Sequence, residues 1–210
     1  MTPSDIVQFI GAQRASAILR TADPSIVAPA MDAAIEGGFR VIEFTLTTPD
    51  ALRHVAAYRE QSELVVGAGT VLTEDEARAA IDAGAQFIVS PVVDEAVISV
   101  AVNAGVCAMP GTHTPTEMLR AHQAGAMLQK LFPAPANGAK YVKAVRGPMP
   151  FLNLVPTNGV HENNVRSYLK AGAHAVGFVT PLFDPVLMQG KDWAGIRERA
   201  ERLRAACGAV

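Results

Sequence analysis

The most constraining feature of this sequence is a unit that recurs along it: an alanine-rich amphipathic stretch, a glycine, and a short apolar run. A glycine at that point is typical of a helix that ends in a left-handed residue, a conformation that other residues adopt at a cost. Five tripeptides have this glycine, and we call them glycine stops: Gly37-Gly38-Phe39, Ala83-Gly84-Ala85, Ala104-Gly105-Val106, Ala124-Gly125-Ala126 and Ala171-Gly172-Ala173. Helix, stop and strand therefore repeat as one unit.

The apolar runs are rich in β-formers and nearly continuous, which is typical of a parallel sheet covered by helices. They lie at Ala15–Arg20, Val41–Leu46, Leu64–Thr70, Phe87–Pro91, Val106–Thr112, Met127–Pro133, Phe151–Thr157 and Ala175–Thr180. Eight such units without a linker between them predict one (β/α)₈ TIM barrel domain over residues 1–210. An open doubly wound sheet is the alternative, disfavoured because no GxGxxG turn follows the first run.

A short helix is predicted before the first strand, over residues 3–13. Ile6, Phe9 and Ile10 recur at helical spacing, and Ser4 precedes them as a suitable cap.

Charge and composition narrow the class of partner. The net charge is −2, with 50% hydrophobic and 18% charged residues, as expected for a globular enzyme that binds neither nucleic acid nor membrane. The start of the chain shows no basic and apolar leader pattern, so we expect a cytoplasmic protein. Cys107 and Cys207 are too few and too far apart for a disulfide framework and are expected to be reduced.

Lys130 is unusual because it lies within the apolar run Met127–Pro133. Burial of an ammonium group lowers its pKa, since the neutral amine loses less on leaving water. A neutral lysine amine is a nucleophile toward carbonyl groups. Lys130 is therefore a candidate for covalent catalysis.

Glu43 is the second charged residue in a predicted strand, within Val41-Ile42-Glu43-Phe44. Inside a barrel it would lie near Lys130, stabilise the lysine's positive charge, and carry protons in a carbonyl reaction. The alternative is a purely structural buried pair, although such pairs contribute little stability by themselves.

Polar residues collect where the runs end, and in a TIM barrel these ends form the mouth that holds the chemistry. Thr157-Asn158-Gly159 and Thr180 follow the last two strands, the usual phosphate position of such barrels. No histidine has metal-ligand spacing, so no metal and no cofactor are expected. The remaining candidates are Arg20, Thr45, Thr47, Thr70, Ser90, Pro91, Thr112, His113 and His161.

Four segments together resemble one known family. They are Val41–Leu46, Val66–Leu72, Ala83–Pro91 and Lys130–Ala134, within a similarity from about Ala17 to Thr180. The family is that of the class I 2-keto-3-deoxy-6-phosphogluconate (KDPG) and 4-hydroxy-2-oxoglutarate (KHG) aldolases, with the related 6-phosphogalactonate (KDPGal) aldolases. The resemblance implies a (β/α)₈ homotrimer that needs no metal and acts on a small 2-keto acid.

The resemblance also implies roles for particular residues. Lys130 matches the Schiff-base lysine and Glu43 the general acid/base. Thr70 matches a group that holds the pyruvate carboxylate, and Arg20 an arginine of the galactonate branch. Phe132 and Pro91 match pocket walls.

The chain departs from the family at three places. Thr47 stands where the KDPG branch has an arginine, Asn158-Gly159 replaces a Gly-Gly pair, and Val179-Thr180 replaces Gly-Ser.

The expected function is class I cleavage of a 2-keto-3-deoxy sugar acid, 6-phosphorylated as KDPG or KDPGal, or of 4-hydroxy-2-oxoglutarate, to pyruvate and an aldehyde. Two alternatives remain open: a phosphate-binding barrel isomerase or synthase without a covalent intermediate, and a non-catalytic barrel.

Overall fold

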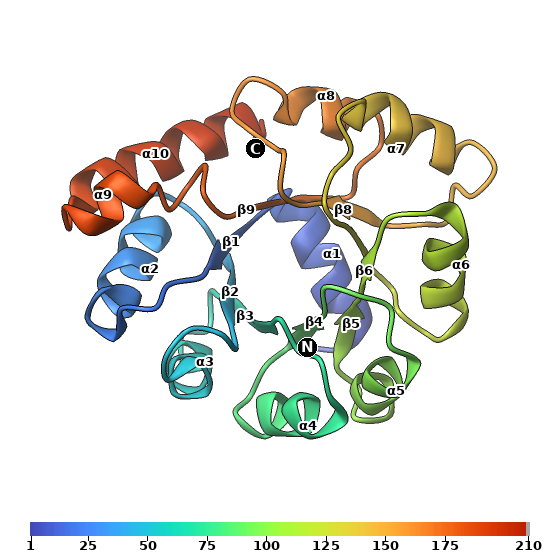
Figure 1. Cartoon of the computed structure of the whole chain (residues 1–210), viewed down its shortest axis with the longest axis horizontal. Helices are drawn as coiled ribbons and strands as arrows, with labels where there is room; N and C mark the ends of the chain where they lie inside the picture. Colours follow the sequence, from blue (N-terminus) through green and yellow to red (C-terminus); the bar gives the residue numbers. More distant parts are fainter. Residues whose placement is uncertain (209–210) are drawn as a thin grey trace.

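A computed structural model describes residues 1–208 and shows a ring of parallel strands surrounded by helices (Figure 1). The strands are β1 (Ala15–Leu19), β2 (Val41–Thr45), β3 (Val65–Gly69), β4 (Phe87–Val89), β5 (Cys107–Met109), β6 (Gly111–Thr112), β7 (Gln129–Leu131), β8 (Leu154–Pro156) and β9 (Val176–Phe178). Each apolar run contains a strand, and the fifth run contains two because Pro110 divides it. The TIM-barrel-like α/β fold predicted from the sequence is confirmed.

Helices lie around the outside of the ring, with the exception of α1, which is seen inside its outline (Figure 1). The helices are α1 (Pro3–Gln13), η1 (Pro24–Ile26), α2 (Val27–Glu36), α3 (Ala51–Arg59), α4 (Glu74–Asp82), α5 (Glu95–Asn103), α6 (Pro115–Gln123), α7 (Gly138–Arg146), α8 (Val165–Lys170), α9 (Pro185–Gln189) and α10 (Trp193–Ala206). The glycine stops are also confirmed, because the glycine that follows each of five helix ends has a positive φ. These are Gly38, Gly84, Gly105, Gly125 and Gly172.

The wall of the barrel consists of two parallel sheets. One has the order β5-β4-β3-β2-β1-β9 and the other β6-β7-β8. They meet at Pro110, which separates β5 from β6, and at an isolated parallel bridge between Thr157 and Gly177. These two joints close the ring.

Two apolar layers follow from the alternation of side chains along each strand. Ile42 and Phe44 of β2 belong to the large outer cluster between strands and helices. Val41, on the opposite face of the same strand, belongs to a smaller cluster inside the ring. Because neighbouring side chains on a strand point to opposite faces, Glu43 between Ile42 and Phe44 faces the interior.

Helix α1 contributes to the interior cluster through Ile6, Val7 and Ile10. It spans residues 3–13 as predicted, but the predicted cap, Ser4, is wrong. Thr2 is the cap, because its hydroxyl accepts from the Asp5 N–H and the Asp5 carboxylate accepts from the Thr2 N–H. The reciprocal pair satisfies two free amides, whereas Ser4 is already the second residue of the helix and is not at the capping position.

In the described part of the chain, no helix combines the length and the apolar character needed to cross a membrane. Cys107 and Cys207 are both free thiols, in agreement with the expectation, and the structure shows that both are buried.

Candidate active site

Lys130 lies on β7 and faces the barrel interior, since its neighbour Leu131 belongs to the outer cluster. It is opposite Gly111 of β6 and Val155 of β8, and only 6% of its surface is exposed. Its Nζ lies 5.0 Å from the centroid of the Phe132 ring. An apolar enclosure of this kind matches the expectation for a lysine that releases its proton easily.

Burial lowers the pKa of Lys130 below the usual 10.5, and the positive charge of Arg20 acts in the same direction. The negative charge of Glu43 opposes both effects but does not outweigh burial. The sequence predicted that Glu43 would stabilise the charged amine. The structure agrees about the direction of that effect and shows that burial is the larger one.

Glu43 lies on β2 with 2% of its surface exposed, opposite Ile18 of β1 and Gly67 of β3. Burial raises its pKa above 4.5, while Lys130 and then Arg20 act to lower it. Its Oε1 is buried without a hydrogen-bond partner among residues 1–208. A carboxyl group in that position favours the protonated form and is ready to exchange a proton.

Gly69 provides the space that Glu43 occupies. A side chain at Gly69 would begin 2.7 Å from Glu43 Cδ and 3.0 Å from Cγ, and closer still to Oε1. The missing side chain at Gly69 of β3 therefore leaves the space that the Glu43 carboxyl group fills.

Lys130 and Glu43 lie on different sheets of the barrel wall, and their charges influence each other's pKa. Among the ion pairs of residues 1–208 there is none between these two groups. An amine and an acid that approach from two walls can act on a carbonyl compound from two sides.

A group of hydroxyls and one guanidinium lies beyond Glu43, at the ends of the first three strands. Arg20 Nη2 donates to Thr70 Oγ1 at 3.1 Å, and Thr70 has a left-handed φ of 59°. The Thr47 hydroxyl, which is exposed, is 3.0 Å from Thr45 Oγ1, and Thr45 Oγ1 is 3.1 Å from Thr48 Oγ1. The sequence singled out Thr47 but not Thr48, because threonine is common near strand ends and the contacts of Thr48 with Leu19 and Thr21 join distant parts of the chain.

Other predicted residues line the wall near Lys130. Gly111 packs against the Pro91 backbone, so a side chain there would strike the Pro91 carbonyl. Thr157 is buried, with its hydroxyl donating to the Val155 carbonyl at 3.4 Å. Phe132 is half-buried beside the Lys130 amine.

The ends of β8 and β9 form a separate cavity of about 260 Å³, with Asn158, Gly159, Gly177, Val179 and Thr180 among its lining residues. Asn158 has φ 63° and Gly159 has φ 103°. Asparagine adopts the left-handed region more readily than most residues, so Asn158 keeps a backbone conformation that a glycine would also allow.

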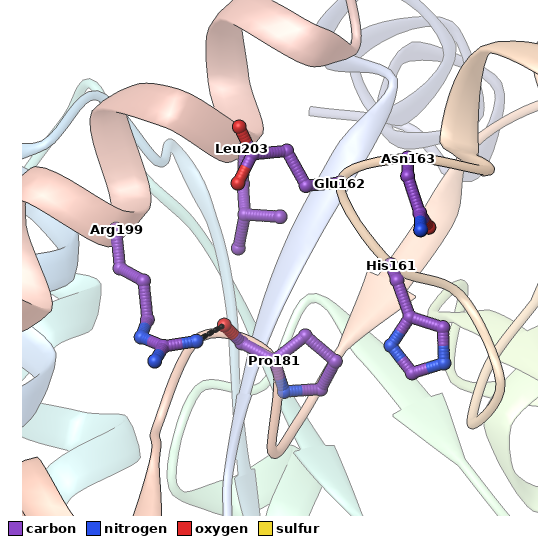
Figure 2. A pocket seen from close by; sticks show the side chains of 6 residues that line it. All are labelled: His161, Glu162, Asn163, Pro181, Arg199 and Leu203. Carbon is purple, nitrogen blue, oxygen red and sulfur yellow. Dashed lines mark hydrogen bonds between the residues drawn. The ribbon is translucent and has the colours of Figure 1, made fainter.

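A further cavity of about 720 Å³ is an open groove between the loop after β8 and helix α10 (Figure 2). It contains His161, and Arg199 Nη1 donates to the Pro181 carbonyl at 3.2 Å. Neither Lys130 nor Glu43 lines it. Its size therefore does not identify the site, and the buried amine and acid do.

His113 lies at the end of β6, exposed, with Nδ1 3.0 Å from the Pro133 carbonyl. Within residues 1–208, no three His, Cys, Asp or Glu side chains are grouped to hold a metal ion. The expectation that the chain needs no metal and no cofactor stays a prediction.

Comparison with known proteins agrees with this geometry. Residues 6–199 match the family described as KDPG and KHG aldolase. A probable 2-dehydro-3-deoxy-6-phosphogalactonate aldolase of Rhizobium meliloti is 37% identical over 197 residues, which is 92% of this chain and 91% of the relative. A 2-dehydro-3-deoxy-phosphogluconate aldolase of Pseudomonas aeruginosa is 35% identical over 183 residues, or 84% and 83% of the two chains.

A solved structure described as native KDPGal superposes with a TM-score of 0.84 at 29% identity, covering 91% of this chain and 93% of that one. Fold, sequence and the arrangement of the buried amine and acid agree, and the chain belongs to the KDPG and KHG aldolase family.

Proposed function

We propose that this chain is a class I aldolase that cleaves a 2-keto-3-deoxy sugar acid to pyruvate and an aldehyde through a Schiff base on Lys130. The observation that carries the proposal is the pair of buried, oppositely perturbed groups: burial lowers the pKa of the Lys130 amine and raises the pKa of the Glu43 carboxyl. Perturbed groups of this kind are what nucleophilic and acid–base catalysis require near neutral pH.

The reaction begins when the neutral Lys130 amine attacks C2 of the keto acid. Glu43 gives a proton to the former carbonyl oxygen as the carbinolamine forms. It then assists the loss of that oxygen as water, which leaves an iminium ion. The half-buried Phe132 ring faces the Lys130 nitrogen at 5.0 Å, a distance that favours a cationic nitrogen.

Cleavage uses the iminium as an electron sink. Glu43 removes the C4 hydroxyl proton, the C3–C4 bond breaks, and its electron pair forms the enamine of pyruvate while the aldehyde half departs. Return of a proton to C3 and hydrolysis of the iminium release pyruvate and restore the free amine.

The substrate carboxylate is proposed to bind at Arg20, Thr47 and Thr70, supported by the Arg20–Thr70 hydrogen bond at the mouth. The distal end is proposed to extend toward Thr157, Asn158, Gly159 and Thr180, supported by the cavity that the last three help to line. Pro91 and Phe132 form the walls between the two ends.

The natural substrate is proposed to be KDPG or KDPGal, with 4-hydroxy-2-oxoglutarate as an alternative. The names of the relatives in both sequence comparisons support the phosphorylated sugar acids. We also propose that residues 1–210 act as one barrel domain and that the chain forms a homotrimer, as family membership suggests.

Reductive trapping tests the covalent step. Pyruvate with borohydride should modify Lys130, identified by mass spectrometry of the peptide, and Lys130→Ala should abolish the adduct. Lys140→Ala on the exposed face of α7 is the matched control and should trap like the wild type.

Turnover of four substrates completes the test: KDPG, KDPGal, the unphosphorylated sugar acids and 4-hydroxy-2-oxoglutarate. A folded Lys130→Arg variant with much of its pyruvate release intact would overturn the covalent mechanism and favour a barrel in which the lysine only balances charge.

A further inference from the structure

Thr45 connects two residues at the mouth by hydrogen bonds from a fully buried position. It is the last residue of β2, two positions beyond Glu43, and has no exposed surface. Its hydroxyl is 3.0 Å from Thr47 Oγ1 and 3.1 Å from Thr48 Oγ1. Both are good distances for hydrogen bonds between hydroxyls.

Thr48 extends the connection to the loop that carries Arg20. The buried Thr48 hydroxyl donates to the Leu19 carbonyl at 3.4 Å, and the Thr21 N–H donates to Thr48 Oγ1, also at 3.4 Å. Leu19 and Thr21 are the residues on either side of Arg20. These two contacts are long, but together they hold the backbone on both sides of the arginine.

The hydroxyls have one consistent order of donors. A backbone carbonyl only accepts, so Thr48 donates to Leu19, Thr45 donates to Thr48, and Thr47 donates to Thr45. One chain of hydroxyls then runs from the exposed Thr47 through the buried interior to the backbone of Arg20.

The side chain of Arg20 has little else to hold it. Within residues 1–208 the Arg20 side chain donates one hydrogen bond, to Thr70 Oγ1, and the residue is exposed. When substrate binds, an exposed arginine loses rotamer freedom in its side chain. If its backbone is already held in place, no backbone entropy has to be lost in addition.

We propose that the buried hydroxyls of Thr45 and Thr48 are positioning groups that hold Thr47 and Arg20 on the same side of the mouth, so that both act on the substrate carboxylate as one unit. This inference rests on the proposed function, because it takes Thr47 and Arg20 as carboxylate ligands. Neither Thr45 nor Thr48 itself needs to touch the substrate.

The test measures reductive trapping of Lys130 as a function of pyruvate concentration, which separates the half-saturating concentration from the maximal rate. Thr45→Val keeps the shape of the side chain and removes the hydroxyl, and Thr48→Val does the same at the second position. We expect Thr45→Val to raise the half-saturating pyruvate concentration about tenfold, as for loss of one or two hydrogen bonds. The maximal rate should change little, because Lys130 and Glu43 are untouched.

Two further comparisons separate positioning from general damage. Thr45→Ser restores the hydroxyl and should bring the half-saturating concentration back near the wild-type value. In the Thr47→Val background, adding Thr45→Val should raise the half-saturating pyruvate concentration much less than Thr45→Val does alone. The reason is that the Thr47 hydroxyl, which Thr45 positions, is already absent.

The outcomes distinguish this inference from the proposed function. If Arg20→Ala and Thr47→Val both leave the half-saturating concentration unchanged, the carboxylate assignment itself is wrong. If those variants weaken binding while folded Thr45→Val and Thr48→Val do not, or if Thr45→Ser fails to restore it, the positioning role is overturned. If Thr45→Val does not fold, Thr48→Val and Thr45→Ser decide between the same outcomes.

Discussion

Replacing Gly69 by alanine should displace the Glu43 carboxyl group while leaving every reacting group present in the protein. The new methyl carbon would lie 2.7 Å from Glu43 Cδ. Since carbon atoms in contact prefer about 3.5–4.0 Å, the carboxyl group must shift by about 1 Å. The clash is with the end of a side chain, but that side chain is 2% exposed, so it has little room to move.

A displacement of about 1 Å in a catalytic group costs roughly 100-fold in rate. We therefore expect Gly69→Ala to lower kcat for pyruvate release about 100-fold. The half-saturating pyruvate concentration in the trapping assay should change little, since Arg20 and Thr70 remain.

Gly67→Ala is the matched control on the same strand. A side chain at Gly67 would meet the Phe87 ring, with one ring carbon at 2.6 Å, rather than the Glu43 carboxyl group. It should lower thermal stability by overpacking the interior, at a cost of about 1–3 kcal/mol, while the folded enzyme keeps its kcat. A folded Gly69→Ala enzyme with wild-type kcat would refute the assignment of Gly69 as the space for the acid.

Three further predictions concern single titratable or strained positions. The rate of trapping by pyruvate and cyanoborohydride should rise with pH to a midpoint below 10.5, because burial lowers the pKa of Lys130; a midpoint at or above 10.5 would contradict this. Burial raises the pKa of Glu43 above 4.5, so the folded state binds more protons there than the unfolded state, and the free energy of unfolding should fall as pH rises from 4.5 through that raised pKa. Glu43→Gln should flatten that part of the stability curve in denaturant titrations at several pH values, and an unchanged slope would count against it. Asn158→Ala should lower the free energy of unfolding by about 1–2 kcal/mol because of its left-handed φ of 63°, whereas Asn158→Gly should not; equal stabilities in urea would show that this turn is unstrained.

The fold was predictable because its signals are local. An apolar run and a glycine after a helix are read from consecutive residues, and each of the five glycine stops has the expected positive φ. The division of the fifth strand at Pro110 follows from the proline, which lacks the N–H that a continuous ladder needs. The Ser4 cap was wrong because both serine and threonine suit that position, and only the reciprocal bonds of Thr2 and Asp5 decide between them.

The candidate site was predictable where a residue is out of character with its surroundings. Lys130 and Glu43 are charged residues within apolar runs, and this contrast identifies them from the sequence. Thr48 and Gly69 are ordinary residues near a strand end, and their interest comes from contacts with Leu19 and Glu43 on neighbouring strands. The pairing of Arg199 with Asp184, at 3.0 Å beside the distal cavity, likewise depends on how a loop and a terminal helix pack.

The two joints of the barrel wall have a consequence for the reacting pair. Glu43 belongs to the six-stranded sheet and Lys130 to the three-stranded one, so no ladder of hydrogen bonds runs unbroken between them. Their separation is set where the sheets meet, at a proline on one side and at the Thr157–Gly177 bridge on the other. A rotation of one sheet against the other changes the reach between amine and acid while each sheet keeps its shape. The distance between the Lys130 amine and the Glu43 carboxyl group therefore depends on how the two sheets pack where they meet, and not on the geometry of either sheet alone.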